Sequence, residues 1–214
     1  MIRKIIKENY KYLLILFCMI VFFYIFKQLN GFEYIQPIDT KVDNFIRNNF
    51  SQNFKYLVHY TSDYIGIYTS ILIIVCMFFK FKNKYYWSLQ MLCYSFSLVI
   101  VWITKYLVCR ARPSMELIAT IDYYSFPSAH ALITFVGYYF LAYMLSLKSD
   151  KKTQIAYYII ATTLVVSVSF TRIYLNVHYF TDIIGALLFG IIILKCLINI
   201  VEKNFKRKLL WKEV

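Results

Sequence analysis

The sequence has few charged residues. Asp, Glu, Lys and Arg make up 16% of its 214 positions, whereas about a quarter is usual in a soluble domain. Stretches rich in proline, glycine or serine are also missing, and no repeat is detectable, so nothing marks a boundary between domains. Hydrophobic residues reach 60%. This composition argues against an ordinary soluble protein and favours a single membrane-embedded domain over residues 1–214.

The five cysteines form no recognisable functional pattern. Their number is odd, no two are spaced C-x-x-C, and no cysteine and histidine share a metal-ligand spacing. Four of them lie inside apolar runs, where cysteine behaves as a small hydrophobic residue. We therefore expect neither a metal site built on cysteine nor a catalytic thiol.

Six apolar runs have the length of a membrane-spanning helix. They cover about 12–29, 58–79, 86–107, 129–147, 154–171 and 181–201. A helix needs roughly 20 residues to cross the hydrocarbon core, and it satisfies its own backbone polar groups there. The first run is too long for a typical signal-peptide core, and no small-x-small cleavage pattern follows it, so we interpret it as an uncleaved anchor. The sequence predicts an all-α polytopic membrane protein with six transmembrane helices.

The basic residues predict how these helices are oriented. Lysine and arginine gather in four segments, at 3–11, 80–84, 148–152 and 203–212. With six spans all four segments lie on one side, and the positive-inside rule makes that side cytoplasmic. Both termini are then cytoplasmic. Most of the net charge of +13 is explained by topology, so we expect no nucleic-acid partner.

The longest polar stretch, residues 30–57, lies outside in this topology. Ile38, Val42, Phe45 and Ile46 recur in it at helical spacing, with Asp39, Lys41, Asp43 and Arg47 between them. This pattern favours a short helix lying at the membrane interface over a plain loop.

Ionisable residues gather in three motifs at the outer ends of the spans. The motifs hold Lys105, Arg112 and Pro113; Pro127, Ser128, Ala129 and His130; and Thr171, Arg172, His178 and Asp182. The predicted topology brings all three to the outer face. Ionisable groups in such positions usually mark a functional site.

The cations of this set suit an anion. Lys105 and Arg112 are seven residues apart and can share one helix face, and Arg172 adds a third positive charge. Ser128 follows a proline and opens a helix, so it is a natural N-cap at a helix end that can bind an anion.

The histidines suit chemistry on that anion. His178 and Asp182 are four apart, which places them one above the other on a helix face. The carboxylate can then accept a proton from one ring nitrogen and leave the other nitrogen to attack. His130 lies two residues inside the helix that Ser128 opens. The set fits phosphoryl transfer through a covalent intermediate, in which one histidine attacks phosphorus and the other protonates the leaving oxygen. Three cations and amide donors can stabilise the charge, so we expect no metal and no cofactor.

In their order and spacing, K-x₆-R-P, P-S-x-H and T-R-x₅-H-x₃-D resemble the type 2 phosphatidic acid phosphatase superfamily, with a motif-bearing core at about 86–201. The six-span layout resembles its integral-membrane lipid phosphatases. The resemblance implies that His178 is the nucleophile, Asp182 its orienting carboxylate and His130 the acid that later activates water. It implies that Lys105, Arg112, Ser128 and Arg172 hold the phosphoryl oxygens. Ala129 stands where the family usually has Gly, and Thr171 where Ser is commoner, and neither change removes a functional group.

The resemblance implies a lipid phosphatase of the plasma membrane, acting at the outer leaflet. The candidate substrates are phosphatidylglycerol phosphate, undecaprenyl pyrophosphate and phosphatidic acid, and the resemblance to small bacterial members favours the first two. A soluble acid phosphatase or a vanadium-type haloperoxidase shares the motifs, but six spans argue against both. A transporter, or a non-catalytic protein that binds lipid headgroups, is the alternative; we find no inverted repeat, and both histidines are present. The oligomeric state and the roles of His59, Asp63 and Arg110 stay open. Arg110 either contacts a lipid headgroup or holds the residues of the site in place.

Overall fold

A computed structural model of the protein describes residues 2–80, 84–113, 124–147 and 149–205. Every regular element in these ranges is a helix, which confirms the all-α prediction. The α-helices are α1 (Ile2–Gln28), α2 (Gly31–Asn49), α3 (Lys55–Asp63), α4 (Thr69–Lys80), α5 (Lys84–Val108), α6 (Ala129–Ser146), α7 (Lys151–Tyr174) and α8 (Phe180–Phe205). A 3₁₀ turn, η1 (Gln52–Phe54), precedes α3, and a π-helical turn, η2 (Tyr64–Tyr68), joins α3 to α4.

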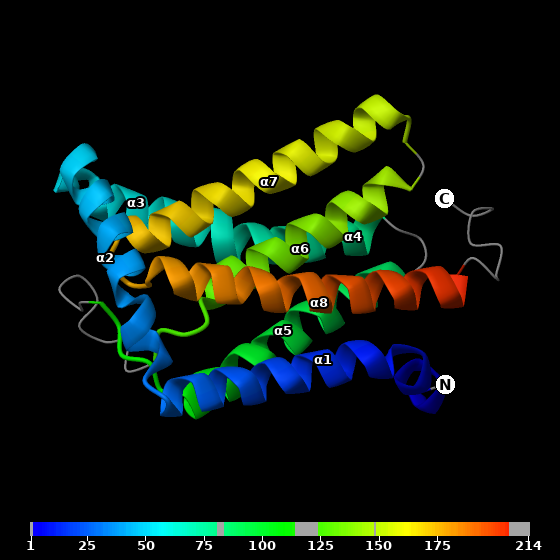
Figure 1. Ribbon diagram of the computed structural model, residues 1–214. Coiled ribbons are helices and arrows are strands. Elements are labelled where there is room, and N and C mark those ends of the chain that lie inside the picture. Colours follow the sequence, from blue (N-terminus) through cyan, green and yellow to red (C-terminus); the bar gives the residue numbers. More distant parts are fainter. Residues whose placement is uncertain (1, 81–83, 114–123, 148, 206–214) are drawn as a thin grey trace.

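The long helices form an elongated bundle, and α2 lies across one end of it (Figure 1). The first turns of α1 and the last turns of α8 lie together at the opposite end. Each long element reverses the direction of the one before it, as short connections between neighbouring spans require. The end of α5, the start of α6, the end of α7 and the start of α8 therefore share the end that α2 crosses.

Five helices are long and apolar enough to cross a membrane. They are found at Lys7–Gln28, Trp87–Val108, Ala129–Ser146, Lys151–Tyr174 and Phe180–Lys203. These helices match five of the six predicted runs to within about three residues at each end, except that the span in α1 begins about five residues earlier than predicted. The remaining run, 58–79, is helical along its length but is divided by the π-helical turn η2, so it contains no single long helix. The number of six spans and the cytoplasmic placement of the termini stay predictions.

Helix α6 is the centre of the bundle and packs against α5, α7 and α8. Its inward side chains Leu132, Val136 and Phe140 are fully buried, as are Phe189 and Ile193 of α8. Apolar side chains also cover much of the outer surface of the bundle, which suits contact with lipid tails rather than water.

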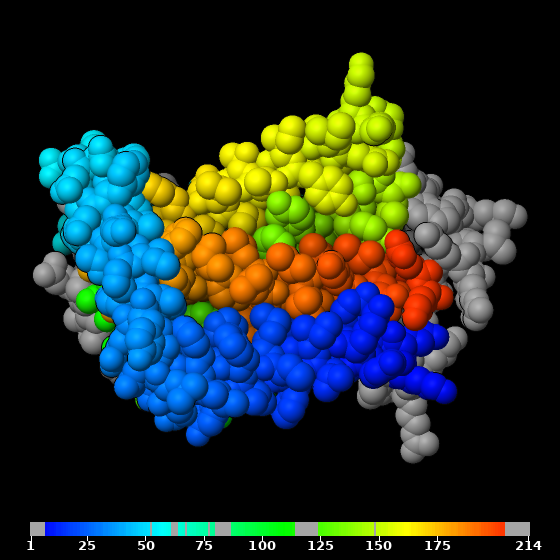
Figure 2. Space-filling model, in the orientation of Figure 1, coloured from blue at the N-terminus to red at the C-terminus, as the bar shows by residue number. Residues whose placement is uncertain are grey.

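The helix predicted between residues 30 and 57 is present as α2, but its buried side differs from the one that the sequence suggested. Ile38 and Phe45 are exposed, whereas Asp39 is buried with only 2% of its surface accessible. The inward stripe is Phe32, Ile35, Asp39, Val42 and Ile46, at steps of three and four residues. Figure 2 shows α2 laid over the end of the bundle, against α8 and beside α1. A carboxylate therefore points from α2 into the protein.

Candidate active site

The structure brings all three motifs to the end of the bundle that α2 covers. Lys105 lies in the last turn of α5, and Arg112 in the non-helical segment that follows. Ser128 precedes the first residue of α6, and Arg172 lies in the last turn of α7. His178 lies in the connection between α7 and α8, and Asp182 in the first turn of α8. Four helix ends thus supply the predicted residues.

Two local details of the sequence analysis were wrong. Lys105 and Arg112 do not share a helix face, because α5 ends at Val108 and Cys109 turns the chain with a positive φ of 50°. Pro113 also disfavours helix at the residue before it. His178 is not on a helix face either, since α8 begins two residues after it. The side chains of both pairs still lie at the end of the bundle that α2 covers, because the segments after α5 and before α8 fold over the helix ends.

His178 and Asp182 form the central contact. Nδ1 of His178 lies 3.4 Å from Oδ2 of Asp182, and both side chains are buried. The backbone N–H of Tyr179 donates to the same Oδ2 at 2.9 Å, which fixes that oxygen towards the imidazole. The histidine contact is longer than a well-formed hydrogen bond, and such contacts often shorten when substrate binds. This geometry leaves Nε2 of His178 on the side away from the carboxylate.

One guanidinium lies beside that second nitrogen, and two further cations lie near the His178 ring. Nη1 of Arg112 lies 3.5 Å from Nε2 of His178 and donates to the carbonyl oxygen of Val177 at 2.7 Å. Lys105 donates to the carbonyl oxygens of Tyr124 and Ser125, which anchors the segment before α6. The side chain of Arg172 is buried, and its carbonyl oxygen accepts from the N–H groups of Val177 and His178. An anion between these side chains would meet concentrated positive charge.

This environment holds the His178 pKa well below its ordinary value. Burial is the largest cause, because it disfavours the charged imidazolium. The nearby positive charges of Lys105, Arg112 and Arg172 act in the same direction. The ring is therefore neutral at neutral pH, as a nitrogen nucleophile must be.

Ser128 occupies the N-cap position of α6, as predicted, but its side chain caps nothing. It is fully buried, and its Oγ has no hydrogen-bond partner among the described residues. Its backbone N–H donates to the carbonyl oxygen of Asp182 at 3.3 Å, which joins the start of α6 to the start of α8. A buried hydroxyl without a partner is costly unless a ligand uses it, which fits the predicted contact with an anion.

His130 lies in the first turn of α6 and faces the interrupted second span. A Cβ atom built on Gly66 of η2 would lie 3.1 Å from Cδ2 of His130. The hydroxyl of Tyr138, also on α6, donates to the carbonyl oxygen of Ile65 in the same π-helical turn. The π-helical turn thus packs directly on the part of α6 that carries the second histidine.

Sequence reasoning missed the role of two residues, Asp39 and Arg110. Arg110 is 6% exposed and donates to Oδ1 of Asp182 at 2.6 Å and to Oδ2 of Asp39 at 2.7 Å. Asp39 in turn accepts from the backbone N–H and the hydroxyl of Thr181, at 2.9 and 2.8 Å. Two roles were left open for Arg110, and these contacts favour the second, in which it holds the residues of the site rather than a lipid headgroup.

The side chain of Asp63 lies outside the part of the chain that the structure describes in detail, and His59 is a half-buried residue of α3.

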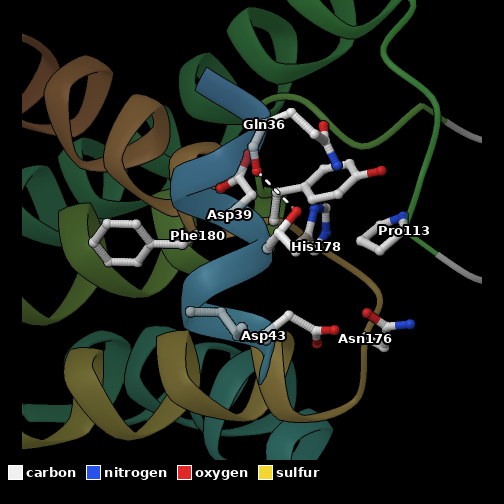
Figure 3. A pocket seen from close by; sticks show the side chains of 10 residues that line it. Gln36, Asp39, Asp43, Pro113, Asn176, His178 and Phe180 are labelled. Carbon is white, nitrogen blue, oxygen red and sulfur yellow. Dashed lines mark hydrogen bonds between the residues drawn. The ribbon is translucent and has the colours of Figure 1, made fainter. Parts of the chain in front are cut away.

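A cavity of about 170 Å³ opens beside His178. Gln36, Asp39, Thr40 and Asp43 of α2 form one wall, and Pro113, Asn176 and Tyr179 form others. Figure 3 shows His178 near Pro113, with the labelled side chains of α2 along the near wall. The nucleophile candidate is thus buried but borders an open space at the end of the bundle.

A chain that sets two histidines, a carboxylate and three cations at one end of a helical membrane bundle has the architecture of a PAP2-type protein. The PAP2 superfamily model matches residues 85–206, more than half of the sequence, and the chain belongs to that superfamily. The resemblance to this superfamily that the motifs indicated is therefore confirmed.

Three comparisons place the chain further. Phosphatidylglycerophosphatase B of Bacillus subtilis (strain 168) is 29% identical over 127 residues, which are 58% of this chain and 62% of the relative. The matched region therefore spans less than two thirds of that relative. The crystal structure of a transmembrane PAP2-type phosphatidylglycerolphosphate phosphatase from B. subtilis aligns with a TM-score of 0.74 at 22% identity, over 90% of this chain and 98% of that one. Aquifex aeolicus LpxE aligns with a TM-score of 0.53 at 17% identity, over 78% of this chain and 94% of its own. The shared fold is that of a multi-pass membrane protein.

Proposed function

We propose that the protein is a lipid phosphatase that removes a phosphoryl group from a membrane lipid through a phosphohistidine intermediate. The observation that carries this proposal is the contact between His178 and Asp182 beside the guanidinium of Arg112. A neutral imidazole, oriented by a carboxylate and facing a cation, is the arrangement that nucleophilic attack on a phosphate requires.

In the first step Nε2 of His178 attacks phosphorus, and the bond from phosphorus to the lipid oxygen breaks. His130 gives its proton to that leaving oxygen, and Asp182 stabilises the charge that develops on the imidazole of His178. In the second step water attacks the phosphohistidine, His130 takes a proton from this water, and phosphate leaves. Lys105, Arg112, Arg172 and the hydroxyl of Ser128 hold the phosphoryl oxygens in both steps.

The substrate class follows from the position of the site. The proposed phosphoryl site lies at the end of an apolar bundle, so an acyl or isoprenyl chain can stay in the bilayer while its headgroup reaches the helix ends. Phosphatidylglycerol phosphate is the first lipid to test, because the B. subtilis relative is named for it. Undecaprenyl pyrophosphate and phosphatidic acid present the same terminal phosphate and are the other candidates.

We further propose that the chain crosses the plasma membrane six times, with both termini in the cytoplasm and the site at the outer face. The alternating direction of the long elements supports this topology (Figure 1). So does the placement of the basic segments, because positive residues are retained in the cytoplasm. A fluorescent protein fused after residue 214 should be fluorescent, whereas a fused periplasmic alkaline phosphatase should be inactive. The opposite pair of results would reverse the topology.

The direct experiment measures phosphate release from the three lipids by detergent-purified protein, beside a His178→Ala variant. We expect the parent to release phosphate from at least one lipid, and the variant to release none. A phosphorylated protein should also be trapped from the parent after an acid-free quench, because phosphohistidine is labile in acid. Full activity of the variant would exclude His178 as the nucleophile. Absence of release by the parent from every lipid would favour a role in binding or transport.

A further inference from the structure

We infer that Asp39 of α2 is a positioning residue for the proposed reaction, acting on Asp182 through Arg110. This inference rests on the proposed function, since it concerns the carboxylate that orients His178. It assigns α2 a part in the chemistry of the site, in addition to any contact that its exposed apolar side chains make with the membrane.

The contacts of Arg110 show how the two carboxylates are joined. Its Nη1 donates to Oδ1 of Asp182 and its Nη2 to Oδ2 of Asp39, at 2.6 and 2.7 Å. The guanidinium carbon also lies over two aromatic rings, 4.4 Å from the centroid of Phe32 and 4.0 Å from that of Tyr179. These two ring contacts and the two carboxylates fix the orientation of the guanidinium. The position of Asp39 therefore determines the position of the group that holds Asp182.

Asp39 is also tied to α8 directly. Its Oδ1 accepts from the backbone N–H of Thr181, and its Oδ2 from the hydroxyl of the same residue. Thr181 lies in the first turn of α8, next to Asp182, where backbone N–H groups have no partner within the helix. A carboxylate from another helix thus caps α8 at the turn that carries the orienting residue, where its negative charge is also favourable to the helix dipole.

The charges give Asp39 a second effect. Arg110 and Asp182 alone would form a buried pair with no net charge. Because Arg110 is shared with Asp39, the group of three carries one net negative charge, and Oδ2 of Asp182 is the oxygen of the group that faces His178. Asp39 therefore keeps Arg110 from neutralising the carboxylate that must stabilise a positive imidazole. Its loss should slow the chemical step without weakening the cations that bind the phosphate.

The test is a double-mutant cycle with Asp39→Asn, Asp182→Asn and the double variant, in full-length protein with the best lipid of the panel. We expect Asp39→Asn to lower kcat by about tenfold to a hundredfold, with KM changed less than about twofold. In the Asp182→Asn background the same change should lower kcat by less than about twofold, because residues that act through one another are not additive. The control is Glu33→Gln, which replaces an exposed carboxylate of the same helix and should leave kcat unchanged.

Equal losses from Asp39→Asn in both backgrounds would overturn the inference, because a purely structural defect lowers the active fraction whether or not Asp182 is present. A kcat equal to that of the parent would also overturn it. If Asp39→Asn cannot be purified as folded protein, Thr181→Ala takes its place in the cycle. That variant removes a hydroxyl that contacts both Arg110 and Asp39, at 2.8 Å each, and leaves every charge in place. We expect a smaller loss of kcat from it, about threefold to tenfold, that again disappears in the Asp182→Asn background.

The cycle also separates this inference from the proposed function. An inactive parent protein would contradict the function. If the parent is active and both the Glu33→Gln and the Asp39→Asn variants have the same kcat as the parent, only the positioning role is contradicted.

Discussion

Gly66 and His130 lie against each other across the interface between the interrupted second span and α6. The backbone of η2 approaches so closely that a Cβ on Gly66 would lie 3.1 Å from Cδ2 of His130, tighter than ordinary van der Waals contact. The other neighbours of that position lie 3.9 Å away and leave room. The imidazole is therefore the group that an added side chain would move.

Gly66→Ala should lower activity without lowering stability. We expect kcat to fall about threefold to tenfold, because His130 must reach the leaving oxygen in the proposed mechanism. The melting temperature should stay the same or rise, since alanine restricts the unfolded chain more than glycine does. Ser70→Ala is the matched control: Ser70 donates to the carbonyl oxygen of Gly66 at 2.6 Å, and we expect its variant to keep the parent kcat. A Gly66→Ala variant with the parent kcat would show that His130 has room to adjust.

The sequence predicted the parts of the fold and site that have local signals. Apolar runs placed the long helices, and three motifs placed Lys105, Arg112, Ser128, His130, Arg172, His178 and Asp182, which the structure gathers at one end of the bundle. Turn geometry was harder. Nothing nearby indicates that Cys109 adopts a positive φ, since this conformation is uncommon for residues other than glycine, asparagine and aspartate.

The contribution of α2 could not be predicted, because its partner is distant in sequence. Asp39 and Arg110 are 71 positions apart, and a carboxylate within an amphipathic helix is ordinarily expected to face solvent. One signal was present. Asp39 occupies a position in the inward stripe that otherwise consists of Phe32, Ile35, Val42 and Ile46. An apolar residue would be expected at that position. A charged residue in such a stripe requires a buried partner, and Arg110, between Lys105 and Arg112 of the first motif, was a candidate.

Asp182→Asn should leave a slow enzyme. The amide cannot carry the negative charge that orients and stabilises the His178 ring, and its NH₂ group would face either the guanidinium of Arg110 or the N–H of Tyr179. A loss of roughly a thousandfold in kcat or more is expected from the corresponding change in other triads. Single-turnover measurements should show that formation of the phosphoenzyme is the step affected. Unchanged formation with slow hydrolysis would assign Asp182 to the second step.

Chelators should not inhibit the enzyme. Lys105, Arg112 and Arg172 lie near His178, and their positive charges would repel a metal ion from the place that the phosphate takes. Among the described residues no three His, Cys, Asp or Glu side chains are grouped to hold a metal. Phosphate release should therefore be the same in millimolar EDTA as without it. Inhibition by EDTA that a divalent ion reverses would contradict this account.

Vanadate should inhibit in competition with the lipid, because it is an oxyanion that can occupy the proposed phosphoryl site. Replacing Arg112 by Gln should weaken this inhibition by about tenfold to a hundredfold, the range expected for a lost hydrogen bond to a charged group. Arg47→Gln is the control, since Arg47 pairs with Asp43 at 2.7 Å on α2 and its variant should keep the parent inhibition constant. An equal effect of both variants would indicate general electrostatic attraction rather than a site at Arg112.

The pH dependence should reflect the lowered pKa of His178. Burial is the main cause of this lowering, and the charges of Lys105, Arg112 and Arg172 add to it. A nucleophile with a lowered pKa stays neutral in mildly acidic solution, so the acidic limb of kcat/KM should lie below the ordinary histidine value of about 6.5. The same shift has the opposite consequence for stability. Below about pH 6.5 the unfolded chain binds a proton at His178 that the folded protein does not, so folding stability should fall as the pH decreases.

Two measurements check this prediction together. Initial rates between pH 5 and 8 should show no acidic limb of kcat/KM above about pH 6, and melting temperatures over the same range should decline on the acidic side. A His178→Gln variant, which has no titrating group at this position, should lose part of that decline. An acidic limb centred at or above pH 7 in the parent protein would mean that the carboxylate of Asp182 outweighs burial and the three cations. The imidazole would then be protonated for much of the time at neutral pH, and attack by His178 would require the loss of a proton first.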